Sequence, residues 1–297
     1  MYKISIIYTV KKEVYVILFI MLYLIKGVDY NMKYCFIGTG NMAGAIIKGL
    51  TLGKNPIDGK NISAISKTNI SAKEFSKECG IVVCDSYTEA VSNSDVIILG
   101  VKPHILSEVA PLIKDTIQKE NPLVVSLAAG KTTEYIESLL GENTKIARVM
   151  PNINAVVGCS VSGLCGNKNT TADDIKKARE IFETIGSVIE IPEDKFGVFS
   201  AVAGASPAFA YIYIDSLARA GVKHGLTKKQ ALEIAANAVL GSAKMVIESN
   251  EHPWALVDRV CSPAGTTIEG VSSLLKDGFE SDIISAIDAV VDKDNRL

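Results

Sequence analysis

The chain has 297 residues, with 31 basic and 33 acidic side chains and a formal net charge of −2. This length suits one large domain or two ordinary ones, and the balanced charge, without long blocks of one sign, gives no indication of nucleic-acid binding. Six cysteines without a C-x-x-C pair and only three histidines make a metal site unexpected, and reduced thiols in a cytoplasmic enzyme are the default interpretation.

The first 31 residues differ from the rest of the chain. Residues 14–25 form an unbroken apolar run between lysines, which is shorter than the roughly 20 residues that a membrane span needs. No small-residue cleavage site of the kind that ends a signal peptide follows it. We therefore expect 1–31 to be an upstream extension outside the fold, as a misplaced start codon would produce, with a membrane anchor as the rival interpretation.

A short apolar run at 33–37 ends in a glycine-rich turn, and a helical pattern follows at once. The turn reads Gly38-Thr39-Gly40-Asn41-Met42-Ala43. Gly38 allows a tight turn, Gly40 lets a pyrophosphate approach the backbone, and Ala43 lets the helix pack on the strand. The helix N-terminus offers free N–H groups to phosphates. A glycine-rich turn without a ligand is the alternative, but the flanking strand and helix favour a dinucleotide site contacted by these six residues.

Strand and helix patterns alternate from Met32 to about Pro192. The strand-like runs are 33–37, 62–65, 96–101, 123–127, 145–149 and 187–191, and the helical patterns between them are 42–52, 71–78, 104–117, 132–139 and 172–184. This alternation predicts a Rossmann-type, mostly parallel sheet covered by helices on both faces. Later patterns are helical only, near 194–221, 227–248, 253–260, 264–275 and 280–293. We therefore predict an NADP-binding α/β domain at 32–192 and an all-α substrate and dimerisation domain at 193–297.

The turn after the second strand bears on the choice of cofactor. An NAD-binding fold usually places an acidic residue there, about 20 residues after the glycines, to hold the ribose 2′-hydroxyl. This chain has Ser66, Lys67 and Thr68 instead, a set that suits a 2′-phosphate. An ordinary polar turn is the alternative. We expect Ser66 and Lys67 to contact the cofactor and NADPH to be preferred over NADH.

Later strands deliver small and polar residues to the edge where open α/β sheets bind ligands. The Lys102 side chain is placed to contact cofactor or substrate, although a lysine after a strand is often only solvated. Pro103 would fix the loop over the ribose, and Asn152 offers an amide to a carboxamide or to the substrate. The cofactor contacts expected from these strand ends are Gly100, Val101, Lys102, Pro103, Ala129 and Asn152.

Several motifs, taken in order, resemble the pyrroline-5-carboxylate reductase family. They are Gly38-Thr-Gly-Asn-Met-Ala43, Val101-Lys-Pro-His104, Ala128-Ala-Gly130, Arg148-Val-Met-Pro-Asn152, Ala218-Arg-Ala-Gly-Val-Lys-His-Gly-Leu226 and Ser262-Pro-Ala-Gly-Thr-Thr-Ile268, spread over 32–297. The resemblance implies an enzyme of proline biosynthesis that reduces a cyclic imine with NAD(P)H. It also implies an interlocked helical dimer in which the substrate loop of one chain completes the nucleotide site of its neighbour.

The loop 262–267 runs straight into a helical pattern. Its N–H groups and the helix dipole suit the substrate carboxylate, and the Thr267 hydroxyl suits that carboxylate or the ring nitrogen. Plain helix capping is the alternative, and the family resemblance favours the site. Hydride transfer to an iminium needs no strong general acid, so the scarcity of histidine is no obstacle. We expect Thr267 and Lys102 to be catalytic and the substrate contacts to be Ser206, Gly265, Thr266 and Thr267.

The chain departs from the usual family pattern in the stretch 203–208, at position 264 and at Tyr87, which stands where an asparagine often approaches the adenosine. Family members usually carry Ser-Gly-Ser-Gly-Pro-Ala where this chain has Ala203-Gly-Ala-Ser-Pro-Ala208, so hydroxyls are moved or lost. Ala264 replaces a usual glycine, which would cost on the order of 1 kcal/mol if the loop needs a positive φ there. These differences bear on substrate and cofactor contacts more than on the type of reaction.

Two other functions stay open from the residues. A two-domain dehydrogenase of the β-hydroxyacid type would need a proton-handling lysine on the helical domain, and the candidates, Lys223 and Lys244, lie in no recognisable motif. A non-catalytic NADP-sensing protein would keep the glycine turn but would not need the loop at 265–267. That loop is intact, which argues against a sensor.

The helical domain predicts self-association. Residues 198–222 contain only two charged side chains, Asp215 and Arg219, and residues 231–247 also contain only two. Helices that are apolar nearly all round must be buried on all sides. The domain is too small to surround them by itself, so we expect a homodimer or a higher homo-oligomer.

Overall fold

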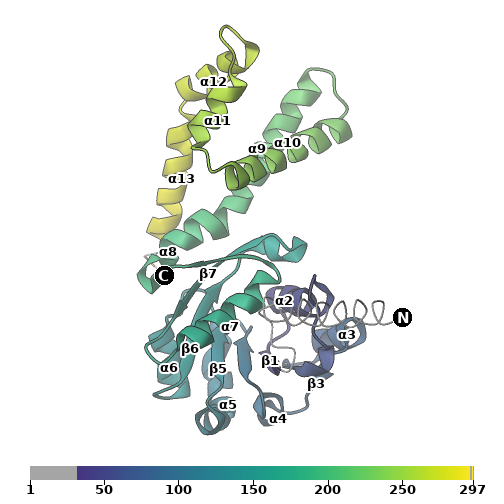
Figure 1. The fold of residues 1–297 in the computed structure, drawn as a ribbon, viewed down its shortest axis with the longest axis vertical. Coiled ribbons are helices and arrows are strands. Elements are labelled where there is room, and N and C mark those ends of the chain that lie inside the picture. Colours follow the sequence, from purple (N-terminus) through teal and green to yellow (C-terminus); the bar gives the residue numbers. More distant parts are fainter. Residues whose placement is uncertain (1–31, 295, 297) are drawn as a thin grey trace, which may run out of the picture. The chain divides into compact units, whose positions relative to one another are not determined.

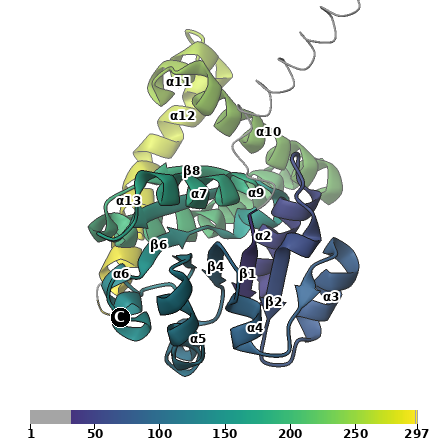
Figure 2. The same cartoon turned by 60° about the horizontal axis from the view of Figure 1, so that its bottom comes forward.

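The computed structural model describes residues 32–294 and residue 296, so the predicted extension at 1–31 lies outside the described residues. The chain forms two compact units, which divide between Asp194 and Lys195. Figure 1 labels most of the helices and strands of both units, and Figure 2 also labels β2, β4 and β8. The first is an α/β unit and the second is helical, as the change of pattern in the sequence predicts.

An eight-stranded sheet organises the first unit (Figure 1). Its strands are β1 Tyr34–Ile37, β2 Ile62–Ile65, β3 Val82–Val83, β4 Val96–Leu99, β5 Leu123–Ser126, β6 Lys145–Met150, β7 Ser160–Gly166 and β8 Gly186–Glu190. They lie in the order β3-β2-β1-β4-β5-β6-β7-β8. Strands β1 to β6 run parallel, β7 is antiparallel to β6, and β8 is parallel to β7. The predicted Rossmann-type, mostly parallel sheet is therefore confirmed.

Helices cover both faces of this sheet (Figure 2). One face carries α2 (Asn41–Leu52), α3 (Ile70–Cys79) and α7 (Ala172–Glu183), and the other carries α4 (Tyr87–Val91), α5 (Leu106–Glu120) and α6 (Thr133–Leu140). Because side chains alternate along a strand, Tyr34 and Phe36 of β1 pack in the first core, whereas Cys35 and Ile37 pack in the second. Burial on both faces explains why these strands read as continuous apolar runs.

The structure adds β3, α4 and β7, which the sequence patterns did not predict. β3 has two residues and α4 has five, too few to show a period. β7 reads Ser-Val-Ser-Gly-Leu-Cys-Gly, and its small and polar residues do not give the apolar pattern that predicts a strand. Ser160 and Ser162 are nevertheless buried, and the Ser160 Oγ accepts the backbone N–H of Asn152 at 3.1 Å.

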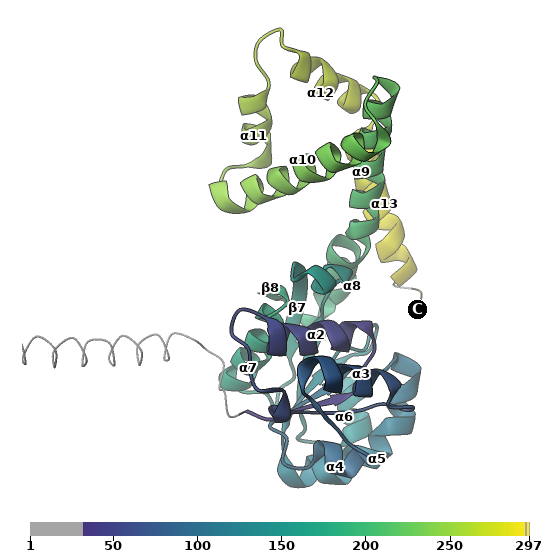
Figure 3. The same ribbon diagram turned by 90° about the vertical axis from the view of Figure 1, so that its right-hand side faces the viewer.

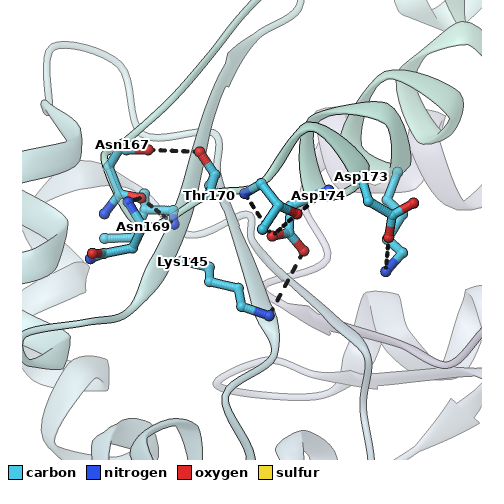
Figure 4. Close-up of polar contacts among 9 residues, drawn as sticks. Lys145, Asn167, Asn169, Thr170, Asp173 and Asp174 are labelled. Atoms are coloured by element: carbon cyan, nitrogen blue, oxygen red, sulfur yellow. Dashed lines mark hydrogen bonds and ion pairs between the residues drawn. The ribbon is translucent and has the colours of Figure 1, made fainter.

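A cluster of polar side chains fixes the turn from β7 into α7 (Figure 4). The Asn167 Oδ1 accepts the backbone N–H of Ile146 at 3.1 Å. The buried carboxylate of Asp174 accepts the N–H and the hydroxyl of Thr171 at 2.9 and 2.7 Å, and lies 3.9 Å from Lys145 Nζ. This capping box starts α7 at the amino end of β6. The cluster therefore lies opposite the sheet edge where the carboxyl ends of β1 to β6 meet.

The second unit consists of helices (Figure 3). They are α8 (Phe196–Phe199), the π-helical turn η5 (Ser200–Ala205), α9 (Ser206–Lys223), α10 (Lys228–Ser249), α11 (Pro253–Val260), α12 (Thr266–Lys276) and α13 (Phe279–Asp294). The run predicted as one helix near 194–221 thus contains a π-helical turn. Pro207 accounts for it, because proline has no N–H for the helical ladder and its ring crowds the fourth preceding carbonyl group.

Much of the apolar surface of the second unit is exposed. A small core of Ala218, Ala231 and Ala235 joins α9 to α10. By length and composition the run Glu193–Lys223 would even suit a membrane span, and only 17% of its apolar stretch is buried. Large apolar side chains of α9 and α10 are exposed to solvent, among them Tyr211, Ile212, Ile234, Leu240 and Ile247.

Candidate nucleotide and substrate sites

Gly38 closes the turn between β1 and α2. Its φ is +93°, and a Cβ there would lie 2.9 Å from the carbonyl carbon of Gly100 and from the nitrogen of Val101. Its N–H donates to the carbonyl oxygen of Ile65 at 2.8 Å. Both the conformation and the space therefore require glycine, and the turn is held against the ends of β2 and β4.

Gly40 leaves the N-terminus of α2 open. It is the N-cap residue, no side chain caps the helix, and no atom lies within 4 Å of the place a Cβ would take. The N–H groups of Asn41, Met42 and Ala43 precede the first bond of the helical ladder, which Gly44 donates to Gly40 at 2.8 Å. Free N–H groups and the helix dipole favour an anion at this point. The arrangement fits the pyrophosphate of a dinucleotide.

Thr39 ties the glycine turn to the start of α3. Its side chain is buried, and its Oγ1 lies 2.5 Å from the Oγ of Ser71. The predicted contact of Thr39 with a cofactor therefore rests on its backbone. The sequence did not predict a role for Ser71, because nothing about a serine in the first turn of a helix indicates a hydrogen bond to a residue 32 positions away.

A buried hydroxyl without a partner marks the turn after β2. Among the side chains of the described residues, the Oγ of Ser66 is the buried oxygen that has no hydrogen bond. The Ser66 backbone N–H donates to Asn69 Oδ1 at 2.7 Å, so the turn itself is well held. Lys67 and Thr68 are exposed beside it. Because a buried polar group without a partner costs free energy, the Ser66 hydroxyl fits a site for a polar ligand.

The carboxyl ends of β4, β5 and β6 complete this edge of the sheet. The Gly100 N–H donates to the carbonyl oxygen of Ile37 at 2.9 Å, which brings the end of β4 against β1. Lys102 is exposed, and Pro103 starts a short 3₁₀ turn after it. Ala129 is exposed after β5, and Asn152 is buried after β6, where its Oδ1 accepts the N–H of Asn154 at 3.2 Å.

Val101 packs beside the core of this edge. The residues predicted to contact the cofactor thus come from the carboxyl ends of parallel strands, from the turns that follow them, or from the first turn of α2. Ser206, Gly265, Thr266 and Thr267 belong to the second unit.

The loop before α12 leaves that helix uncapped. Gly265 is the N-cap residue, and no side chain accepts a hydrogen bond from the first turn. Thr266 and Thr267 are the first two helical residues, and both are exposed, so the capping interpretation of these threonines is wrong. Ala264 has a φ of +55°, the left-handed conformation for which alanine pays a free-energy cost. Ser206 stands on another helix, at the start of α9.

Two of the six thiols are poor nucleophiles. Burial raises the pKa of Cys35 to about 12 and that of Cys165 to about 11, so both stay protonated and unreactive at neutral pH. Between residues 32 and 296, as far as they are described, no group of three or more metal-ligating side chains comes together.

Both units of the chain resemble known protein families. Residues 193–297 match the model of the pyrroline-5-carboxylate reductase dimerisation domain, and residues 33–130 match the model described as coenzyme F420-dependent NADP oxidoreductase. The chain is 39% identical to pyrroline-5-carboxylate reductase of Methanosarcina acetivorans over 86% of its own length and 94% of the relative's. It is 37% identical to the Escherichia coli enzyme of that name, over 89% and 98% of the two lengths.

Solved structures of proteins with the same name also resemble this chain. A pyrroline-5-carboxylate reductase from Coxiella burnetii superposes with a TM-score of 0.86 at 32% identity, covering 90% of this chain and 98% of that one. The Plasmodium falciparum enzyme, solved with NADP bound, gives a TM-score of 0.76 at 30% identity with the same coverage. Identity and coverage of this extent show that the chain belongs to the pyrroline-5-carboxylate reductase family.

Proposed function

We propose that this protein reduces 1-pyrroline-5-carboxylate to L-proline with NADPH. The observation that carries the proposal is the open N-terminus of α2 behind Gly40, on the same chain as a pyrroline-5-carboxylate reductase dimerisation domain. The free helix N-terminus suits the pyrophosphate, and the buried Ser66 hydroxyl offers a further polar contact. The residues present therefore fit a nicotinamide dinucleotide.

The chain contributes position rather than acid–base chemistry. Bound NADPH supplies the hydride, and an iminium carbon accepts it without a strong general acid. The uncapped first turn of α12 holds the substrate carboxylate through its N–H groups and dipole. The Thr267 hydroxyl bonds to that carboxylate or to the ring nitrogen, and Gly265, Thr266 and Ser206 are further substrate contacts in this proposal. Fixing the imine in this way lowers the barrier by removing freedom of motion before the reaction.

The contacts at the sheet edge hold the nicotinamide half of the cofactor. Backbone at Gly100 and Val101 and the small side chain of Ala129 leave room for a flat ring. Pro103 keeps the loop over the ribose in place, and Lys102 reaches cofactor or substrate from an exposed position. Asn152 is held by its bond to Asn154 and presents its amide at the end of β6.

The preference for NADPH comes from the turn after β2. Ser66, Lys67 and Thr68 place two hydroxyls and an ammonium group where a carboxylate would repel a 2′-phosphate. The test is the rate of NADPH and NADH oxidation with 1-pyrroline-5-carboxylate, in the unchanged protein and in Lys67→Glu. We expect NADPH to be used better, and Lys67→Glu to narrow or reverse the preference. Equal use of both cofactors by the unchanged protein would contradict it.

The remaining parts of the proposal concern assembly and location. The dimerisation domain makes the protein a homo-oligomer, so a second copy rather than a lipid bilayer covers the apolar face of the run Glu193–Lys223. The six cysteines are free thiols, in keeping with a reducing cytoplasm. Family membership weighs against a β-hydroxyacid dehydrogenase and against a non-catalytic NADP sensor.

A further inference from the structure

Glu193 closes a three-part clamp at the end of the first unit. Its Oε1 accepts the backbone N–H of Thr133 at 2.7 Å, and its Oε2 accepts the Thr133 hydroxyl at 2.9 Å. Arg148 Nη1, on β6, donates to the same Oε1 at 3.2 Å. The Thr133 residue and the Arg148 side chain are only 6% and 11% exposed, whereas the Glu193 side chain is 30% exposed, so water reaches the carboxylate but is largely kept from its two partners. Charge-assisted bonds of this kind are stronger than neutral ones.

The clamp joins three segments that are far apart in the sequence. Thr133 is the first residue of α6, and the Glu193 carboxylate lies at that helix N-terminus, where a negative charge is stabilised. The loop from Ala128 to Lys131, which ends β5 and holds the predicted nicotinamide contact Ala129, leads directly into this helix. On the other side, Glu193 stands two residues before Lys195, where the helical unit begins.

We infer that Glu193 is a positioning residue for hydride transfer: its clamp with Thr133 and Arg148 fixes both the loop that carries Ala129 and the point where the chain leaves for the substrate-binding unit. This inference rests on the proposed function, because it supposes that a nicotinamide lies against the loop of Ala129 and that the helical unit carries the substrate site. Small displacements of bound reactants are costly in rate, so a loose clamp slows the reaction without removing any group that touches substrate.

The test compares Glu193→Gln with Glu190→Gln in the full-length enzyme. Glutamine keeps the size of Glu193 and can still accept the Thr133 N–H, so the variant is expected to fold, whereas the charge that holds Arg148 is lost. Glu190 is the matched control: it lies three residues earlier, pairs with Arg179 at 2.5 Å, and is about half exposed. For each variant one measures kcat, the KM for 1-pyrroline-5-carboxylate, the Kd of NADPH, the Tm, and the isotope effect with NADPH deuterated at the transferred position.

For Glu193→Gln we expect kcat to fall by roughly tenfold to a hundredfold, the KM for the imine to rise, and the isotope effect on kcat to increase. The NADPH Kd should change less than kcat, because the pyrophosphate site at Gly40 and the α2 N-terminus is untouched and only the contact at Ala129 is loosened. Glu190→Gln should match the unchanged enzyme throughout. A lower Tm with normal kcat and isotope effect would overturn the inference, since it would make the clamp merely structural. If the unchanged enzyme fails to reduce the imine, the proposed function fails instead.

Discussion

Gly38 and Gly40 stand two positions apart in one turn, yet the chain needs each for a different reason. Gly38 has a left-handed φ and no space for a Cβ, so the fold itself demands glycine. Gly40 has a φ of −75°, which any residue adopts, and open space beside it. The fold does not require glycine at position 40, and we therefore propose that a ligand approaching the backbone explains it.

Exchanging each of these glycines for alanine should separate the two roles. In Gly40→Ala we expect the NADPH Kd to rise at least about tenfold, because a methyl group enters the space for the pyrophosphate, with a loss of stability of about 1 kcal/mol or less from the poorer N-cap. Gly38→Ala should lose about 1–3 kcal/mol through strain. Cofactor titration and denaturant unfolding measure the two effects. A Gly40→Ala enzyme with normal NADPH affinity would show that no phosphate approaches there.

Within the proposed substrate site, Thr267 is the residue whose exchange we expect to have the largest effect. Thr267→Val should raise the KM for the imine and lower kcat, since one hydrogen bond to a charged group is worth about 1.5–3 kcal/mol, while NADPH affinity stays the same. The Tm should also stay the same, because Gly265 and not Thr267 is the N-cap of α12. Steady-state kinetics with both substrates varied provide the measurement, and an unaltered kcat/KM would remove Thr267 from the site.

At the scale of elements, most of the strands that the sequence predicted are buried on both faces, whereas β8, also predicted, is largely exposed. β1, β2, β4, β5 and β6 are apolar runs followed by helical patterns, and such runs signal parallel strands by themselves. β7 could not be predicted, because its buried serines are satisfied by tertiary partners such as the N–H of Asn152. The π-helical turn η5 could not be predicted either, because a proline indicates that a helix is interrupted but not whether the interruption is a kink, a break or a π-helical turn.

In the candidate site, too, some residues could be predicted from the sequence and others could not. Gly38 and Gly40 were predictable because a glycine-rich turn between a strand and a helix is a local motif that the sequence shows directly. The Thr39–Ser71 bond and the Glu193 clamp were not, because they link elements 32, 45 and 60 residues apart through side chains with no motif of their own. Residues that position other residues generally leave no local signature, and only the folded chain reveals them.

The start of α7 offers a test of the structural cluster in Figure 4, with two neighbouring aspartates as the matched pair. Asp174→Ala removes a buried capping box and the contact with Lys145, so we expect a loss of about 1–2 kcal/mol in the free energy of unfolding. Asp173→Ala removes only a solvent-exposed pair with Lys177 and should cost about 0–1 kcal/mol. Denaturant unfolding at one protein concentration measures both. Equal losses, or a change in kcat per folded enzyme, would contradict this assignment.

At the scale of the whole molecule, α9 and α10 should form the interface between copies. Ala208 is exposed on α9, near open apolar side chains such as Tyr211 and Ile212. A charge placed there would be buried without a partner on association. We therefore expect Ala208→Glu to abolish assembly and activity together.

Sedimentation velocity and the imine reduction assay, run on the same samples of Ala208→Glu, test this expectation. Ala172→Glu is the control, because it adds the same charge to an exposed position at the start of α7, in the first unit. That control should remain assembled and active. A fully active Ala208→Glu monomer would contradict the expectation, as would an active monomer of the unchanged protein.

The small alanine core between α9 and α10 also affects how the protein is made. Residues up to Asp194 can bury their sheet as soon as they have left the ribosome, whereas the helices that follow find no cover until a second copy arrives. A new chain therefore spends a period half folded, and the length of that period depends on how many other copies are near. The expression level therefore affects folding. At a low concentration of the protein, new chains keep their apolar helices exposed for longest and are the most vulnerable to proteases and to aggregation.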